Sequence, residues 1–150
     1  MFTTRRTLGL TIALLALAAA PGDGASQDRV AVLEAPNAAV TLAEALEARA
    51  WALTQGRPRW KRAADLYRRA ARLRGPGQFR AAEILHLAGS LYFYGDRAKT
   101  ALRTHREAGE AFLALGDVPG AARAFLDGAW VAAEAGRTLE GRGLLERARL

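Results

Sequence analysis

The sequence contains no cysteine among its 150 residues, and this absence excludes several classes of protein. A disulfide framework, a cysteine-based zinc site, a cysteine nucleophile and a lipid-modified cysteine anchor all require a thiol. β-Branched residues are also scarce, whereas alanine and arginine are heavily used, so the helical state is favoured along the chain. Apolar residues make up 51% and charged residues 25%, which is typical of one globular domain, with room for a leader.

The sequence also lacks the motifs of common catalytic sites. It has no G-x-G-x-x-G, no phosphate-binding loop, no G-x-S-x-G and no H-E-x-x-H. The nearest approach to a metal site is Glu83 with His86, which share one helix face, and His105 and Glu107 are further candidate ligands. The alternative is that His105 packs inside and His86 lies at the surface. We therefore predict no catalytic residue, no metal and no cofactor.

A basic pair and a short apolar run open the chain. Arg5 and Arg6 precede residues 8–20, which carry no charge and as a helix of about 20 Å are too short for a ~30 Å hydrocarbon core. This pattern is typical of a signal peptide, so we assign residues 1–25 to a leader and expect an exported protein, periplasmic or secreted. The arginine pair resembles the twin-arginine export signal, although ordinary leaders also carry adjacent arginines.

Glycines punctuate the rest of the chain at spacings of 19, 20, 21 and 20 residues. They are Gly56, Gly75, Gly95, Gly116 and Gly136. Between them apolar residues recur three and four positions apart, the periodicity of helices that bury one face. The predicted helices cover residues 41–54, 60–74, 78–94, 97–114, 119–135 and 139–149. Residues 26–40 lack a sustained period, and we expect a linker or an N-terminal cap there.

The six predicted helices form three hairpins that copy one another. Within the second helix of each hairpin, a large residue stands between two small ones. The three copies are Ala63, Tyr67 and Ala70, then Ala101, His105 and Ala108, then Gly141, Leu145 and Ala148. Small residues allow a neighbouring helix to cross closely, and the large residue fills the adjoining groove. The first helices align at offsets of 39 and 40 residues, with Ala50, Gly89 and Ala129 midway along them.

This pattern resembles the tetratricopeptide repeat over residues 41–150, in a long-helix variant with a period of ~40 residues in place of 34. The resemblance implies an all-α fold in which three antiparallel hairpins stack as a short right-handed α-solenoid. A plain helical bundle is the alternative. The chain departs from the family at Pro58 and Arg59, which lengthen the first turn, and at His105, which replaces the usual aromatic residue.

In that family the first helix of each hairpin lines a concave surface, which implies a groove that binds a peptide or a protein. The residues that this register places there combine large aromatic side chains with charged ones, as anchors and rims of interfaces do. They are Glu44, Glu47, Trp51, Glu83, His86, Ser90, Phe93, Arg123 and Trp130. The alternative is that Trp51 and Trp130 pack between the repeats.

Positive charge is concentrated over residues 57–80, with nine basic residues against Asp65 alone. The candidate basic patch on the helix over 60–74 consists of Lys61, Arg62, Arg68, Arg69 and Arg72. Such a face is commonly only solvated, but it can also contact anionic lipid headgroups or an acidic partner. Export and the lack of interleaved aromatics argue against nucleic acid. The sequence therefore predicts a non-catalytic protein-interaction module, with a membrane-peripheral protein as the alternative.

Cleavage of the leader can be tested directly. Pro21 disfavours cleavage immediately after Ala20, and we expect the mature chain to begin between Ala20 and Ser26. Intact-mass measurement of the protein in the envelope fraction locates this end. Retention of Met1 on every molecule would exclude cleavage, although it would leave tethering by an intact leader open.

Overall fold

The computed structural model describes residues 36–149, and within them every regular element is an α-helix. The elements are α3 (Pro36–Ala52), α4 (Trp60–Arg74), α5 (Phe79–Tyr94), α6 (Ala98–Ala114), α7 (Val118–Glu134) and α8 (Thr138–Arg147). The all-α class predicted from the sequence is confirmed. The leader expected over residues 1–25 lies outside the described residues. No helix between residues 36 and 149 is long and apolar enough to cross a membrane.

Five of the six helices keep both ends within two residues of the prediction, and the exception is the start of α3. This helix begins at Pro36, five residues before the predicted start, so residues 36–40 belong to α3 and do not form a linker. Proline suits the first position of a helix, because the N–H that it lacks would have no partner inside the helix. Residues 36–40 lack a strong helical periodicity, which is why the sequence does not predict the start of this helix. Packing against α4 stabilises α3, and packing commonly contributes more to a helix than its own sequence pattern does.

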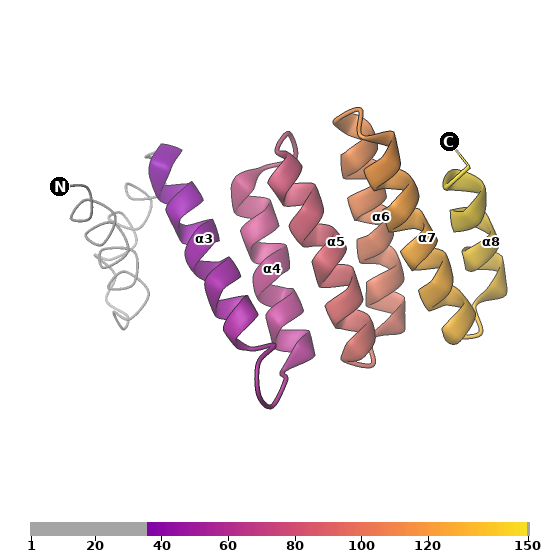
Figure 1. Ribbon diagram of the computed structural model, residues 1–150, viewed down its shortest axis with the longest axis horizontal. Coiled ribbons are helices and arrows are strands. Elements are labelled where there is room, and N and C mark those ends of the chain that lie inside the picture. Colours follow the sequence, from indigo (N-terminus) through magenta and orange to yellow (C-terminus); the bar gives the residue numbers. More distant parts are fainter. Residues whose placement is uncertain (1–35, 150) are drawn as a thin grey trace, which may run out of the picture.

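The helices pack in the order of the sequence. Each one lies mainly against the helix before it and the helix after it, and α5 also contacts α7. Figure 1 shows them following one another across the molecule from α3 to α8, with α6 behind α7. Packing between sequence neighbours is consistent with an α-solenoid, in which each hairpin contacts only the adjacent hairpins.

A residue with positive φ marks each turn between helices. The five are Gly56 (66°), Gly75 (87°), Asp96 (57°), Gly116 (76°) and Gly136 (67°). The left-handed residue after α5 is therefore Asp96, and not Gly95 as the glycine spacing suggests. Aspartate tolerates this conformation better than most residues. Gly95 serves a different purpose, since a Cβ there would lie 3.1 Å from the backbone nitrogen of Lys61.

Close helix crossings rely on glycines that face a large side chain sixteen residues further along the chain. A Cβ added to these glycines would lie 2.9, 2.4 and 3.0 Å from the facing side chain, which is closer than packed atoms normally approach. The pairs are Gly89 with His105, Gly109 with Phe125, and Gly128 with Leu144. All three large side chains are buried. The absence of a Cβ is therefore what allows α5, α6, α7 and α8 to approach one another.

The small–large–small pattern of the second helices holds in α4 and α6, where Tyr67 and His105 are buried, but not in α8. There Leu144 is the buried residue and Leu145 is 46% exposed, so the prediction for Leu145 is wrong. The reason lies in the preceding helix. The glycine that receives this leucine is Gly128, one position before Ala129, and the large residue moves by the same one position.

These crossings predict opposite effects for two glycine-to-alanine changes. Gly109→Ala places a methyl group against the rigid ring of Phe125, and we expect it to lower the free energy of unfolding by about 1–3 kcal/mol. The control is Gly143→Ala on α8, where nothing lies within 4 Å, and it should raise stability by ~0.5–1 kcal/mol through helix propensity. Urea denaturation followed by circular dichroism measures both. Equal effects would contradict the proposed role of Gly109.

Candidate functional site

A hollow of about 430 Å³ opens between α5 and α7. Its lining residues come mainly from these two helices, with Phe112 supplied by α6. They are Phe79, Glu83, His86, Leu87, Ser90, Phe112, Asp117, Gly120, Arg123 and Asp127. Four of the residues predicted to share a groove, Glu83, His86, Ser90 and Arg123, are thus brought together around one space.

Helical periodicity explains why these side chains meet. On α5, Phe79, Glu83, His86 and Ser90 follow one another at intervals of four, three and four residues, which forms a single stripe along the helix. Residues 120, 123 and 127 form the matching stripe on α7. Since α5 and α7 contact each other, the two stripes become the two walls of the hollow.

A hydrogen bond joins the walls at the middle of the hollow. Nε2 of His86 lies 2.7 Å from Oδ2 of Asp127, and the imidazole of His86 is mostly buried. The offset of 40 residues inferred from the sequence places Leu126, and not Asp127, opposite His86. The true offset between the two helices at this point is 41 residues and not 40, a difference that only the packing of α5 on α7 reveals.

Beneath His86 lies the second histidine of the chain. The rings of His86 and His105 are 5.3 Å apart, and His105 is only 1% exposed. Its Nδ1 atom has no hydrogen-bond partner among the described residues. The pKa of His105 is lowered to about 4, mainly by burial and to a smaller extent by the neighbouring His86, whereas Asp127 acts in the opposite direction. His105 is therefore a neutral core residue at physiological pH.

Aromatic side chains continue the walls beyond the hollow. The rings of Phe93 on α5 and Trp130 on α7 meet edge to face with centroids 4.8 Å apart, and Trp130 is 52% exposed. Trp51 on α3 is 62% exposed and does not line the hollow. Neither tryptophan is therefore a buried core residue, although one face of Trp130 packs against Phe93 of the preceding hairpin.

The predicted groove residues on α3 behave differently from those on α5 and α7. Glu44 is exposed and lies outside the hollow. Glu47 accepts hydrogen bonds from Arg74 at 2.6 Å and from Arg80 at 2.8 Å, and its side chain is only 11% exposed. Glu47 is therefore a structural link between α3, α4 and the start of α5, and it is not free to meet a partner.

The hollow combines an apolar surface with an acidic rim. Phe79, Leu87 and Phe112 supply the apolar part. The carboxylates of Glu83, Asp117 and Asp127 outnumber the single guanidinium of Arg123. Asp117 also accepts a hydrogen bond from the backbone N–H of Gly120 at 3.1 Å and thereby caps α7. Such a surface suits a ligand that carries an apolar group next to a positive charge.

Ser90, His86 and Asp127 are the residue types of a nucleophilic triad, and all three line the hollow. A triad requires a hydrogen bond between the serine hydroxyl and the histidine. Within residues 36–149 His86 bonds only Asp127, and Ser90 has no side-chain hydrogen bond. The described part of the chain therefore lacks the contact that would activate Ser90.

The metal site considered from the sequence is not assembled in the described residues. Glu83 pairs with Arg80 at 3.2 Å, while Glu107 pairs with Arg68 at 3.0 Å. Over residues 36–149 no group of three histidine, aspartate or glutamate side chains is placed to hold a metal ion.

The basic patch on α4 is partly neutralised. Lys61 pairs with Asp65 at 3.0 Å. Arg68, predicted to be exposed, is largely buried in its ion pair with Glu107, which links α4 to α6. The remaining members of the patch, Arg62, Arg69 and Arg72, are exposed and have no ion pair with another described residue.

No family model, no curated protein and no solved structure matches this chain.

The low pKa of His105 predicts a specific loss of stability in mild acid. In the unfolded chain the imidazole of His105 binds a proton near pH 6.5, but in the folded chain it does so only near pH 4. The contribution of neutral His105 to the free energy of unfolding is therefore complete above pH 6.5 and falls as the pH drops toward 4. We therefore expect the free energy of unfolding to be about 2 kcal/mol lower at pH 5 than at pH 7 because of this residue. Urea unfolding of wild type and His105→Leu at both pH values measures it.

Leucine suits this test because Leu144 occupies the equivalent position opposite Gly128. The His105→Leu variant should lose less stability between pH 7 and pH 5 than wild type does. An identical loss in both proteins would mean that other groups cause the pH dependence.

Proposed function

We propose that this chain is an exported, tetratricopeptide-like interaction module that binds an extended peptide segment of a partner protein. The binding surface would be the α5–α7 groove, defined here as the hollow between these helices together with Phe93 and Trp130. The observation that carries the proposal is the continuity of this surface. One stripe of α5 supplies Phe79, the polar residues of the hollow and Phe93, and Trp130 lies against the far end.

The dimensions of the groove suit a short extended segment. Phe79 and Phe93 are fourteen residues apart on α5, or about 21 Å at 1.5 Å per residue. An extended peptide of roughly six residues spans that length at ~3.3 Å per residue. Exposed aromatic side chains at both ends provide anchors, and the polar residues between them provide hydrogen bonds to the peptide backbone.

The charge of the groove favours a partner segment in which a basic residue lies beside an apolar one. Three carboxylates surround the apolar surface, those of Glu83, Asp117 and Asp127. Arg80 pairs with Glu83 and His86 bonds Asp127, so Asp117 is the one of the three without an ion pair among the described residues. A lysine or arginine of the partner would find its counter-charge here, while acidic segments would be repelled. The partner is expected among exported or envelope proteins, because the leader directs the chain there.

The alternative function is contact with anionic lipid through α4. Three exposed arginines without ion pairs among the described residues, Arg62, Arg69 and Arg72, support it. Lys61 and Arg68 are already paired within the protein, which weakens the attraction to a lipid surface. The patch also offers no apolar side chains to insert between lipids, and we therefore favour the groove.

A displayed library of random twelve-residue peptides tests the proposed function. Selection against the mature protein should enrich peptides that carry a basic residue next to an aromatic or aliphatic one. Trp130→Ala should weaken the binding of an enriched synthetic peptide by roughly 30-fold, since an aromatic anchor commonly contributes ~2 kcal/mol. Fluorescence anisotropy of the labelled peptide gives the dissociation constants.

Leu139→Ala is the matched control, because Leu139 is 83% exposed on α8 and lies outside the groove. It should leave the affinity unchanged, and neither variant should shift the melting temperature by more than a few degrees. Enrichment of acidic peptides, or equal binding by wild type and Trp130→Ala, would disprove the α5–α7 groove as the peptide site.

A further inference from the structure

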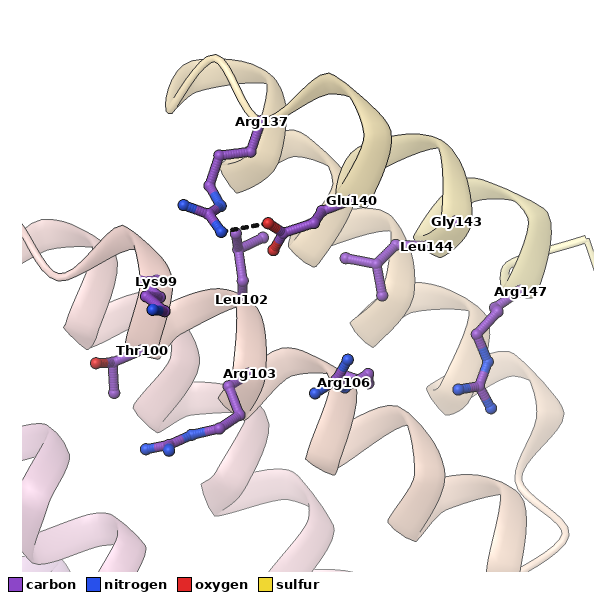
Figure 2. Close-up of a pocket in the computed structure, with 10 residues that line it drawn as sticks. All are labelled: Lys99, Thr100, Leu102, Arg103, Arg106, Arg137, Glu140, Gly143, Leu144 and Arg147. Carbon is purple, nitrogen blue, oxygen red and sulfur yellow. Dashed lines mark hydrogen bonds and ion pairs between the residues drawn. The ribbon is translucent and has the colours of Figure 1, made fainter.

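A second hollow, of about 510 Å³, lies between α6 and α8 and shares no lining residue with the α5–α7 groove. Half of its ten lining residues are cationic. The cations are Lys99, Arg103, Arg106, Arg137 and Arg147, and the lone acid is Glu140. Figure 2 shows the residues of α6 along one side of the hollow and the residues from Arg137 to Arg147 along the other.

Ion pairs within the protein neutralise only part of this charge. Three of the arginines have an acidic partner: Arg103 with Glu107, Arg137 with Glu140, and Arg147 with Glu110. Lys99 and Arg106 have no ion pair with any described residue. The hollow thus keeps unpaired positive charge among cations that repel one another, a cost that a bound anion would remove.

The cations form two rows and do not surround a single point. Lys99, Arg103 and Arg106 are four and three residues apart, so they occupy one face of α6 over about 10 Å. Arg137 immediately precedes α8 and Arg147 is its last residue, so the two lie about 15 Å apart along the helix axis. A single phosphate or sulfate ion would reach only part of such an array, whereas an elongated anion with several charged groups would reach most of it.

The remaining lining contains few large apolar side chains, and those present are buried. Leu102 and Leu144 are the two large apolar side chains in the hollow, and they offer little surface to an apolar ligand. The volume lies within the range of ~300–1,000 Å³ that is usual for small-molecule sites. Guanidinium groups donate hydrogen bonds in a planar fork that matches two phosphate oxygens.

We propose that the α6–α8 hollow binds a small oligophosphate, an elongated anion that carries two or more phosphoryl groups. The proposal does not depend on the α5–α7 groove, because the two sites use different residues and opposite charges. A polycarboxylate offers a similar total charge without tetrahedral phosphoryl groups, and comparison of the two ligands tests the phosphate assignment.

Isothermal titration calorimetry of the full chain with sodium tripolyphosphate, citrate and sulfate at ~0.1 M constant ionic strength tests this site. Tripolyphosphate should bind with one-to-one stoichiometry and at least tenfold more tightly than citrate or sulfate. Arg106→Gln should weaken tripolyphosphate binding by about tenfold, because a charge-assisted hydrogen bond is lost. Lys99→Gln, on the same face of α6, should act in the same direction.

Both substitutions leave every ion pair of the described residues intact, and circular dichroism should therefore show an unchanged fold. The control is Arg142→Gln, which removes the same charge from α8 outside the hollow and should retain full affinity. Equal weakening by Arg142→Gln, equal affinity for citrate, or no binding of tripolyphosphate would each overturn the proposal.

Discussion

The contact of a large side chain with a glycine of the preceding helix is the constraint on which the other features of the array depend. Where Gly109 receives the ring of Phe125, or Gly89 the ring of His105, the two helix backbones approach as closely as their atoms allow. Each such contact fixes how far one helix is rotated about its axis relative to the next. That rotation decides which stripe of α5 and α7 faces outward, and hence which side chains line the α5–α7 groove.

His105 shows how tightly this constraint is coupled to the site. Its ring fills the space above Gly89 and lies under His86, which is hydrogen-bonded to Asp127. A hydrocarbon side chain would pack there as well, but it would stay uncharged at every pH. With histidine in this position, the stability of the array depends on the proton concentration, although the ring is not exposed to a ligand. Burial of this histidine also leaves its Nδ1 atom without a hydrogen-bond partner among the described residues, which is unfavourable.

Local signals in the sequence were sufficient to predict the helices and many of the residues of the hollow. The glycine intervals and the three- and four-residue spacing of apolar residues depend only on the chain itself, and they placed Glu83, His86 and Ser90 on one stripe. What the sequence did not reveal depends on how one helix sits against another. In α8 the buried leucine is Leu144 and not Leu145, because it packs against Gly128. The pairing of His86 with Asp127 depends on the register between α5 and α7. Glu47 forms ion pairs with arginines that are 27 and 33 residues away in the sequence. The start of α3 at Pro36 is not predicted for a related reason. The sequence there has no strong apolar periodicity, and the face of α3 that is covered depends on where α4 packs.

Packing between sequence neighbours has a consequence for the length of the chain. Because α8 contacts mainly α7, and α7 contacts mainly α6 and α8, loss of the last hairpin would leave the contacts among α3, α4 and α5 untouched. Insertion of another forty-residue hairpin would likewise disturb only the junction at which it enters, since the energy of such an array is a sum of neighbouring terms. An architecture of this kind can change in size by whole hairpins during evolution without redesign of its interior. The hollow between α5 and α7 and the hollow between α6 and α8 each span two hairpins, so loss of the last hairpin would remove one wall of both.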